Sequence, residues 1–310
     1  MKNLFKNCLS VKECDGWLTP TRFTDGMEKN YAKSEPRSVR CGCPASVCLA
    51  FHTKATKLSF EYRIGGKARQ WAVVDVTCDG VLYGSVSLLG TTGRVELDLP
   101  GDERVEVRVY LPQLVCIDLR NISANAPLVP TEKREKLWLA LGDSITQGMV
   151  AKHPSLTYPT LLSEHLDCDL INYGVGGIRF EEETLDYIGV EPDMITVALG
   201  CNDFGTLDTD TVKANMRAYL NKLTKLYTCE NVYAILPIWR CDDATRMGDF
   251  DAHREAIREI YSEYSHIKLI DGYCLVPKLE EFYGDPEGNI HPNDTGFLLY
   301  ALKLAKLLKI

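Results

Sequence analysis

The sequence predicts an α/β protein built from two units: an all-β sandwich, followed by a three-layer α/β/α unit around a parallel sheet. Short apolar runs separated by turns fill residues 45–124, whereas apolar runs alternate with longer helical stretches after residue 136. Between them, residues 125–136 hold two prolines and a run of charges without apolar periodicity. A chain of 310 residues is long enough for two domains, and we place them at 1–128 and 129–310.

The first unit is predicted to consist of seven short strands. Alternation is clearest from Val105 to Val109, where the apolar side chains share one face. Asp79-Gly80 separates two runs as a type I′ turn, because glycine accepts the positive φ that this turn demands. The spacing indicates a jelly-roll-like β-sandwich, and we expect residues 1–45 to be loops around it. The strands are expected at Val47–Phe51, Leu58–Tyr62, Trp71–Val76, Val81–Leu89, Val95–Leu99, Val105–Leu111 and Leu114–Leu119.

The second unit alternates between strand and helix. Long helical stretches cover Thr211–Leu226 and Ala252–Tyr264, and a last helix is expected over Phe297–Leu308 with Asn293 as its N-cap. This alternation predicts a parallel sheet with helices on both faces. In the flavodoxin-like strand order 2-1-3-4-5, the carboxyl ends of the first three strands meet at one edge. The strands are expected at Leu137–Leu141, Leu170–Tyr173, Met194–Leu199, Val232–Ile238 and Ile267–Ile270.

Composition argues against several classes of partner. The chain has 35 Lys and Arg residues against 43 Asp and Glu, and this net charge of −8 argues against nucleic acid or an anionic membrane as a partner. The last helical stretch is too short and too rich in lysine to cross a membrane. Residues 1–8 start with positive charge but lack the apolar core of a signal peptide, so we expect a cytoplasmic protein.

The twelve cysteines are expected to be free thiols, because they are scattered over a chain without an export signal. The tightest cluster, Cys41, Cys43 and Cys48, lacks a second Cys or His pair at zinc spacing. No dinucleotide fingerprint accompanies the motifs described below. We therefore expect neither a metal nor an organic cofactor.

One stretch, Leu141–Gly148, combines a strand end, a Gly-Asp-Ser turn and the start of a helix. A strand that stops just before a helix places the next side chain at the carboxyl edge of the sheet, beside the free N–H groups of the helix N-terminus. Ser144 would there present an exposed hydroxyl, with its own N–H available to bind an oxyanion. This is the position that a serine nucleophile needs.

The block Gly142–Gly148, Gly-Asp-Ser-Ile-Thr-Gln-Gly, resembles the first signature of the SGNH (GDSL-type) hydrolases, a family of serine esterases. Three further blocks follow in the order of that family, and the resemblance covers residues 134–310. These blocks are Asn172–Gly177, Gly200–Asp203 and His291–Asn293.

The resemblance implies a role for one residue of each block. Ser144 would be the nucleophile and His291 the general base that takes its proton and later protonates the leaving group. Ser144 N–H, Gly177 N–H and the Asn202 side-chain amide would stabilise the negative charge that builds on the carbonyl oxygen. Because these residues follow the first three strands, the predicted strand order brings them together.

The sequence departs from the family pattern at one position. The usual aspartate three residues before the histidine is replaced by Gly288. Asp285, Glu287 or a backbone carbonyl near Gly288 could hold the imidazole of His291 instead. We favour the backbone carbonyl, which would leave a dyad of Ser144 and His291.

Other polar residues near the blocks receive weaker assignments. Asp143 and Asp203 are expected to brace their turns by hydrogen bonds, and Cys201 to be a packing thiol. Trp239 and Arg240 follow the fourth strand, where they could stack on a sugar ring and bond its hydroxyls or pack between domains. Arg179 is open to the same two interpretations.

The N-terminal sandwich resembles that of bacterial carbohydrate esterases that remove acetyl groups from sugars. The main hypothesis is therefore an acetyl esterase whose partner is a small acylated saccharide. One alternative is a lysophospholipase or thioesterase, although no apolar lid segment is visible that would build an acyl-chain groove. The other alternative is a non-catalytic carbohydrate-binding relic of the fold. Oligomeric state cannot be deduced from the sequence.

Overall fold

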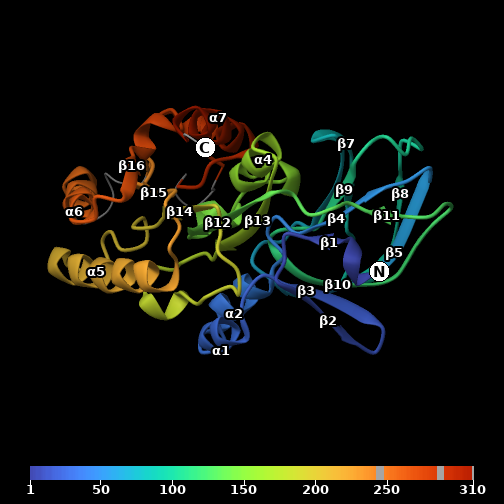
Figure 1. Ribbon diagram of the computed structural model, residues 1–310, viewed down its shortest axis with the longest axis horizontal. Coiled ribbons are helices and arrows are strands. Elements are labelled where there is room, and N and C mark those ends of the chain that lie inside the picture. Colours follow the sequence, from blue (N-terminus) through green and yellow to red (C-terminus); the bar gives the residue numbers. More distant parts are fainter. Residues whose placement is uncertain (242–247, 285–289, 309–310) are drawn as a thin grey trace.

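The computed structural model describes residues 1–241, 248–284 and 290–308. Two antiparallel sheets lie at one end of the molecule and a parallel sheet with its helices at the other, as Figure 1 shows. The predicted fold class, a parallel α/β unit preceded by a β-sandwich, is therefore confirmed.

The N-terminal unit is a sandwich whose two sheets share one buried core, in which Phe51 and Val109 of one sheet meet Phe60 and Leu119 of the other. All seven predicted strands are present, and the jelly-roll topology stays a prediction. The first sheet runs β1 (Phe5–Lys6), β4 (Cys48–His52), β9 (Val107–Tyr110), β6 (Val73–Cys78) and β7 (Val81–Ser87), with β11 (Val129–Pro130) also beside β4. The second sheet runs β2 (Ser10–Cys14), β3 (Trp17–Thr21), β10 (Val115–Ala124), β5 (Lys57–Lys67) and β8 (Thr92–Asp98).

The predicted Asp79-Gly80 turn joins β6 to β7. Both residues have positive φ, 48° and 76°, as a type I′ turn requires. Cys78 and Val81 pair directly across it, so the register of the hairpin follows from the turn.

The C-terminal unit holds a five-stranded parallel sheet in the predicted order 2-1-3-4-5. Helices α4 and α7 cover one face of it, and α5 and α6 cover the other. The strands run β13 (Cys168–Gly174), β12 (Lys136–Gly142), β14 (Met194–Ala198), β15 (Val232–Ile235) and β16 (Ile267–Ile270). The helices are α3 (Ser144–Gln147), α4 (Tyr158–His165), α5 (Thr209–Leu226), α6 (Phe250–Ser262) and α7 (Asp294–Leu307). Short 3₁₀ helices occur at η1 (Lys2–Leu4), η2 (Pro154–Leu156), η3 (Glu182–Thr184), η5 (Gly272–Cys274) and η6 (Glu280–Phe282).

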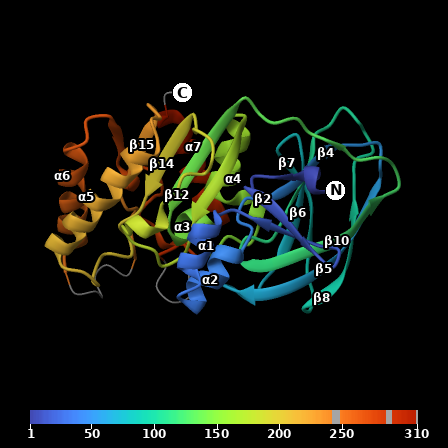
Figure 2. The same ribbon diagram turned by 60° about the horizontal axis from the view of Figure 1, so that its bottom comes forward.

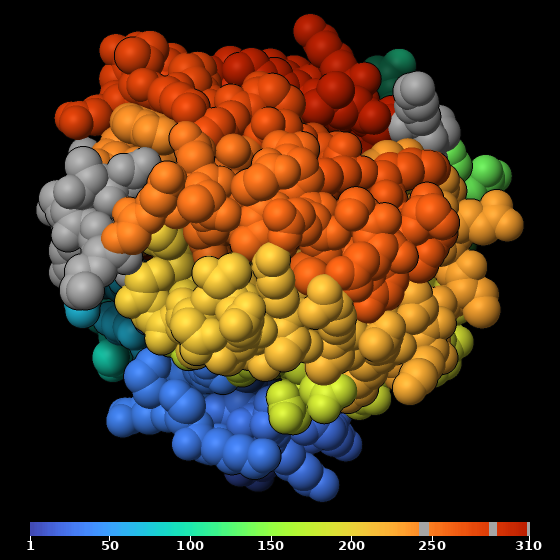
Figure 3. Space-filling model, turned by 90° about the vertical axis from the view of Figure 1, so that its left-hand side faces the viewer, coloured from blue at the N-terminus to red at the C-terminus, as the bar shows by residue number. Residues whose placement is uncertain are grey.

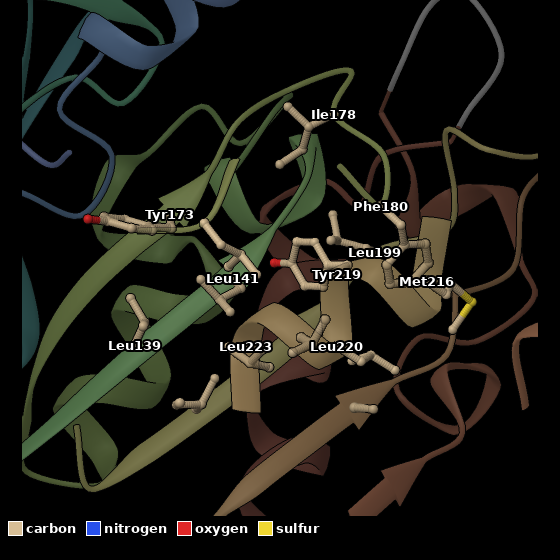
Figure 4. Packing of buried hydrophobic residues seen from close by; sticks show 14 of the residues in the cluster. Leu139, Leu141, Tyr173, Ile178, Phe180, Leu199, Met216, Tyr219, Leu220 and Leu223 are labelled. Carbon is tan, nitrogen blue, oxygen red and sulfur yellow. The ribbon is translucent and has the colours of Figure 1, made fainter. Parts of the chain in front are cut away.

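Helix α5 packs through one apolar stripe. Leu220 and Leu223 of α5 lie against Leu139 and Leu141 of β12 in the core shown in Figure 4, and all four side chains are almost completely buried. Burial of such a leucine contributes roughly 2 kcal/mol. Helices α5 and α6 lie side by side on the outer surface of the unit (Figure 3).

The last helix begins where the sequence predicts. Asn293 is the N-cap of α7, and its Oδ1 accepts the Gly296 N–H at 3.0 Å. Within the described ranges, no helix has an apolar stretch long enough to cross a lipid bilayer. All twelve cysteines are free.

The prediction that residues 1–45 are loops is wrong. They form β1 to β3 and two helices, α1 (Asp25–Tyr31) and α2 (Glu35–Gly42). Two sequence signals indicate this secondary structure in residues 1–45. Asp15-Gly16 repeats the positive-φ pair of the Asp79-Gly80 turn and joins β2 to β3, and Thr24 caps α1 by accepting the Met27 N–H.

Helices α1 and α2 lie at the junction of the two units, in front of α3 in Figure 2. Phe23, Met27 and Tyr31 belong to the same buried core as Tyr173 of β13, and the rings of Phe23 and Tyr173 are 4.6 Å apart. This N-terminal segment therefore helps to build the core of the second unit. The division of the chain at residue 128 stays a proposal.

Arg22 links this segment to the end of β13. Its side chain is 1% exposed and donates to the carbonyl oxygens of Asn172, Gly174 (3.2 Å), Cys43 (2.8 Å) and Arg40 (3.1 Å). Four carbonyls from two parts of the chain thus depend on one guanidinium group.

We expect Arg22→Ala to lower the free energy of unfolding by roughly 3 kcal/mol, because several buried carbonyls lose their donor. Urea unfolding measures this change. The control is Arg104→Ala, which removes a side chain that is 86% exposed and should change stability by less than about 0.5 kcal/mol. Equal stability of Arg22→Ala and Arg104→Ala would contradict the stabilising role of the Arg22 hydrogen bonds.

Candidate active site

Ser144 stands at the turn between β12 and α3. The strand ends at Gly142, and Asp143 caps the helix because its Oδ1 accepts the Ile145 N–H at 2.9 Å. Ser144 is therefore the first residue of α3, where its N–H has no acceptor within the helix. The side chain is at the carboxyl edge of the parallel sheet, and Ser144 is 8% exposed.

Two glycines allow α3 to approach the sheet this closely. A Cβ on Gly142 would overlap the side chain of Thr146, and a Cβ on Gly174 would overlap the backbone of Gln147. Asn172, to which sequence reasoning gave no role, fixes the contact. Its Nδ2 donates to Thr146 O at 2.9 Å and its Oδ1 accepts the Gly174 N–H at 2.8 Å.

His291 lies directly beside Ser144, with its Nε2 2.8 Å from Ser144 Oγ. His291 is only 6% exposed. Its segment is held to the preceding residues by backbone bonds from Gly284 N–H to His291 O (3.1 Å) and from Asn293 N–H to Phe282 O (3.0 Å). The imidazole is thus anchored on a short antiparallel backbone pairing that precedes α7 in the chain.

Gly177 and Asn202 lie at the same edge of the sheet. Asn202 Nδ2 donates to Ile178 O at 2.9 Å and lies 3.4 Å from Oδ2 of Asp143, so its amide contacts the neighbours of both Gly177 and Ser144. Gly177 has a φ of 81°, which favours glycine. The structure therefore brings all four predicted site residues to one place.

The N-terminal unit also reaches this place. The Gln147 side chain accepts the Gly176 N–H at 2.9 Å and donates to Arg40 O, in α2, at 3.0 Å. Gln113 of the sandwich donates to Ala151 O, just after α3, at 2.8 Å. Sequence reasoning did not find Gln147 or Arg40, because their partners are backbone atoms.

A comparison with known protein families assigns the chain to one of them. The model of the GDSL-like lipase/acylhydrolase family matches residues 140–299, which is more than half of the chain. The chain belongs to this family. The matched segment of this GDSL-like acylhydrolase contains all four blocks that the sequence analysis singled out.

Solved structures share the fold of this chain over most of its length. The salicylyl-acyltransferase SsfX3 from a tetracycline biosynthetic pathway is 21% identical, with a TM-score of 0.83, over 98% of this chain and 94% of that one. A putative GDSL-like lipase from Bacteroides ovatus is 16% identical, with a TM-score of 0.72, over 100% and 97%. A family two carbohydrate esterase from Clostridium thermocellum, solved with cellohexaose, is 17% identical, with a TM-score of 0.65, over 85% and 91%. No curated protein sequence matches significantly.

Several weaker assignments from the sequence change in the structure. Arg240 is 2% exposed and donates to Cys201 O at 2.7 Å, so the suggestion that it bonds sugar hydroxyls is wrong. Trp239 packs edge-on against Tyr283, with ring centroids 5.5 Å apart, inside the second unit; its stacking on a sugar stays a prediction. Arg179 donates to Asn202 O at 3.1 Å. The candidate partners of His291 at positions 285, 287 and 288 lie outside the described residues.

Two buried carboxyl groups flank the site. Asp143 makes the predicted bond to its turn, and burial raises its pKa to about 6. Asp203 braces its turn through the main chain, because its carbonyl oxygen accepts the Thr206 N–H at 3.2 Å, whereas both of its carboxylate oxygens are buried without a hydrogen bond of normal geometry in the described ranges. Burial raises the pKa of Asp203 to about 7, and the Phe180 N–H and the Arg179 guanidinium group oppose this only in part.

We expect Asp203→Asn to stabilise the protein, and more so at pH 8 than at pH 5. The pKa of Asp203 rises from 3.8 to about 7 on folding, so the folded state binds more protons between these values. This carboxyl therefore lowers the free energy of unfolding as pH rises through that window, and its full cost is present above pH 7. Asparagine does not ionise, and the gain at pH 8 should be roughly 1 to 3 kcal/mol.

Urea unfolding of both proteins at the two pH values measures this gain. Asp210→Asn, at an exposed position in the first turn of α5, serves as the matched control and should show no such difference. A stability gain for Asp203→Asn that is equal at pH 5 and pH 8 would contradict the raised pKa of Asp203.

Proposed function

We propose that the protein is a serine esterase that hydrolyses small acyl esters through an acyl-serine intermediate. The observation that carries the proposal is the 2.8 Å contact between His291 Nε2 and Ser144 Oγ in a nearly buried site. His291 takes the proton as Ser144 Oγ attacks the ester carbonyl, and then passes it to the leaving alcohol. Water attacks the acyl-serine with the same help from His291 and releases the acid.

The tetrahedral intermediate carries a negative charge on the former carbonyl oxygen. We assign Ser144 N–H, Gly177 N–H and Asn202 Nδ2–H as its donors. One N–H of Asn202 is held by Ile178 O at 2.9 Å, whereas the contact to Asp143 is long at 3.4 Å. A bond of that length is weak, so the second N–H is the one available to an oxyanion.

We further propose an acetyl ester of a carbohydrate as the substrate. Support comes from the sandwich that contacts the site and from neighbours in fold that are named as carbohydrate esterases of family two and as an acetyl xylan esterase from Butyrivibrio proteoclasticus. The twelve free cysteines support action in a reducing compartment such as the cytoplasm.

Hydrolysis of 4-nitrophenyl esters of two, four, eight and twelve carbons tests the acyl preference. We expect kcat/KM to be highest for the acetate and to fall with chain length. A preference for eight or twelve carbons would favour the lysophospholipase or thioesterase alternative. No turnover of these esters or of acetylated sugars would favour the non-catalytic relic.

A second candidate is acyl transfer to an acceptor other than water. It is favoured by the match over 98% of the chain to a protein named as a salicylyl-acyltransferase. The products formed from 4-nitrophenyl acetate in the presence of sugar alcohols distinguish an esterase from an acyltransferase. A transferase would form the acetylated alcohol in preference to free acetate, whereas an esterase would release acetate whatever alcohol is added.

A further inference from the structure

Arg40, in the last turn of α2, is fixed against the candidate active site by its main chain. Its carbonyl oxygen accepts from Gln147 Nε2 at 3.0 Å and from Arg22 Nη2 at 3.1 Å. Gln147 belongs to α3, three residues after Ser144, and also holds the Gly176 N–H. The position of Arg40 is thus tied to the helix and to the turn that carry two of the proposed oxyanion donors.

The side chain of Arg40 lies on the Gly176-Gly177 turn. Nη1 donates to Gly176 O at 2.8 Å. A Cβ on Gly176 would stand 3.1 Å from Cδ and 3.2 Å from Nε of Arg40, and a Cβ on Gly177 would stand 3.0 Å from Nη1. The guanidinium group therefore covers the turn whose Gly177 N–H we assign to the oxyanion.

The charge of Arg40 is not neutralised by a carboxylate within the described ranges. Arg37, one turn earlier on α2, shows the usual arrangement, because it binds Glu181 with two bonds of 2.6 and 2.7 Å. Burial lowers the pKa of Arg40, and the positive charges of Arg69 and Arg37 nearby lower it further. A half-buried cation in this setting attracts an anion.

Arg40 also has hydrogen-bond donors to spare. A guanidinium group carries five N–H donors, and in the described part of the chain the side chain uses one of them, toward Gly176 O. Arg22 differs, because its donors are spent on four carbonyl oxygens. The remaining N–H groups of the Arg40 guanidinium have the geometry to donate two parallel hydrogen bonds to the two oxygens of a carboxylate.

We propose that Arg40 is a specificity residue that binds an anionic group, such as a carboxylate, on the ester substrate. This inference rests on the proposed function, since it names a chemical feature of the substrate of that same site. With the acetyl group proposed above, the anionic group belongs to the alcohol part. An anionic acyl group, such as succinyl, is the alternative, and it would replace acetyl in that proposal.

Two matched substrate pairs test the proposal. On the acyl side, 4-nitrophenyl monosuccinate is compared with its neutral relative, 4-nitrophenyl butyrate. On the alcohol side, 2-acetoxybenzoate is compared with its methyl ester. Each substrate is tested with the wild type, Arg40→Gln and Arg40→Lys, and with Arg37→Gln as the control that removes a charge already neutralised by Glu181.

We expect Arg40→Gln to lower kcat/KM for the charged member of one pair by about 10- to 100-fold, mainly through KM, and for its neutral relative by less than about 3-fold. For the charged substrate, kcat/KM of Arg40→Lys should lie between those of the wild type and Arg40→Gln. Arg37→Gln should change kcat/KM equally for both members of a pair. The pair that responds identifies the acyl or the alcohol side. Equal losses for charged and neutral members of both pairs would overturn the proposal and leave Arg40 as a positioning residue of the turn.

Binding is measured separately, so that failure of the proposed function can be recognised. Calorimetric titration of 2-acetoxybenzoate and of monomethyl succinate into the Ser144→Ala protein, with and without Arg40→Gln, should show about 10- to 100-fold weaker binding when Arg40 is replaced. If the wild type cleaved no ester, and the Ser144→Ala protein still lost affinity when Arg40 was replaced, the esterase would be refuted and the anion site would stand. Affinities that do not depend on Arg40 would refute the anion site, whatever the activity.

Discussion

Replacing Ser144 by alanine is expected to lower kcat/KM for 4-nitrophenyl acetate by at least about 10³-fold. The reason is chemical, because an alanine side chain forms no acyl-enzyme, and only binding and the oxyanion donors would remain. The hydroxyl contacts His291 at 2.8 Å, and its removal leaves the backbone of α3 and its cap on Asp143 unchanged. Initial rates and thermal unfolding of both proteins measure the effect.

The matched control is Ser262→Ala at the end of α6, where the hydroxyl bonds, among the residues that the structure describes, only to Glu259 O of its own helix. It should retain the full rate. If Ser144→Ala kept more than a tenth of the wild-type activity while remaining folded, another residue would have to be the nucleophile.

The second large effect is expected for His291→Ala, with a loss of about 10³-fold or more in kcat/KM. Without the imidazole, the Ser144 hydroxyl has no base to take its proton. The substitution also leaves a space beside Ser144 Oγ, so added imidazole should restore part of the rate in proportion to its concentration. Rates at increasing imidazole concentration measure this rescue.

His266→Ala is the matched control, because His266 is an exposed residue whose ring lies against Tyr264, away from the site. It should be fully active and insensitive to imidazole. An inactive His291→Ala protein that imidazole does not rescue, although it unfolds at the wild-type temperature, would argue against His291 as the base.

Much of the fold follows from signals that lie close together in the chain. The five apolar runs after residue 136 predict the parallel sheet because each is bounded by turns and separated by a helical stretch. The strand order then explains why Ser144, Gly177 and Asn202 share one edge, although dozens of residues separate them. The contact of His291 with Ser144 follows only from the resemblance to the SGNH hydrolases, and the structure brings the two side chains together.

The contribution of the N-terminal segment could not be predicted in the same way. Arg22 and Arg40 act on backbone carbonyls far away in the sequence, and a carbonyl oxygen leaves no signature in the identity of its residue. The burial of Arg240 was missed for a related reason, since its partner is Cys201 O. Asp15-Gly16 is different, because this turn was visible in the sequence and was overlooked.

The bonds of Arg22 also bear on how the protein is made. Its carbonyl acceptors at Asn172 and Gly174 are 150 and 152 residues further along the chain. At the usual speed of translation they leave the ribosome roughly 8 to 30 s later. The strands of the sandwich, which end with β11, can pair within that interval. Arg22 and the apolar side of α1 must wait for β13, whereas α2 packs on β5 and β10 of the sandwich. The nascent chain therefore exposes Arg22 and α1 until β13 has been synthesised.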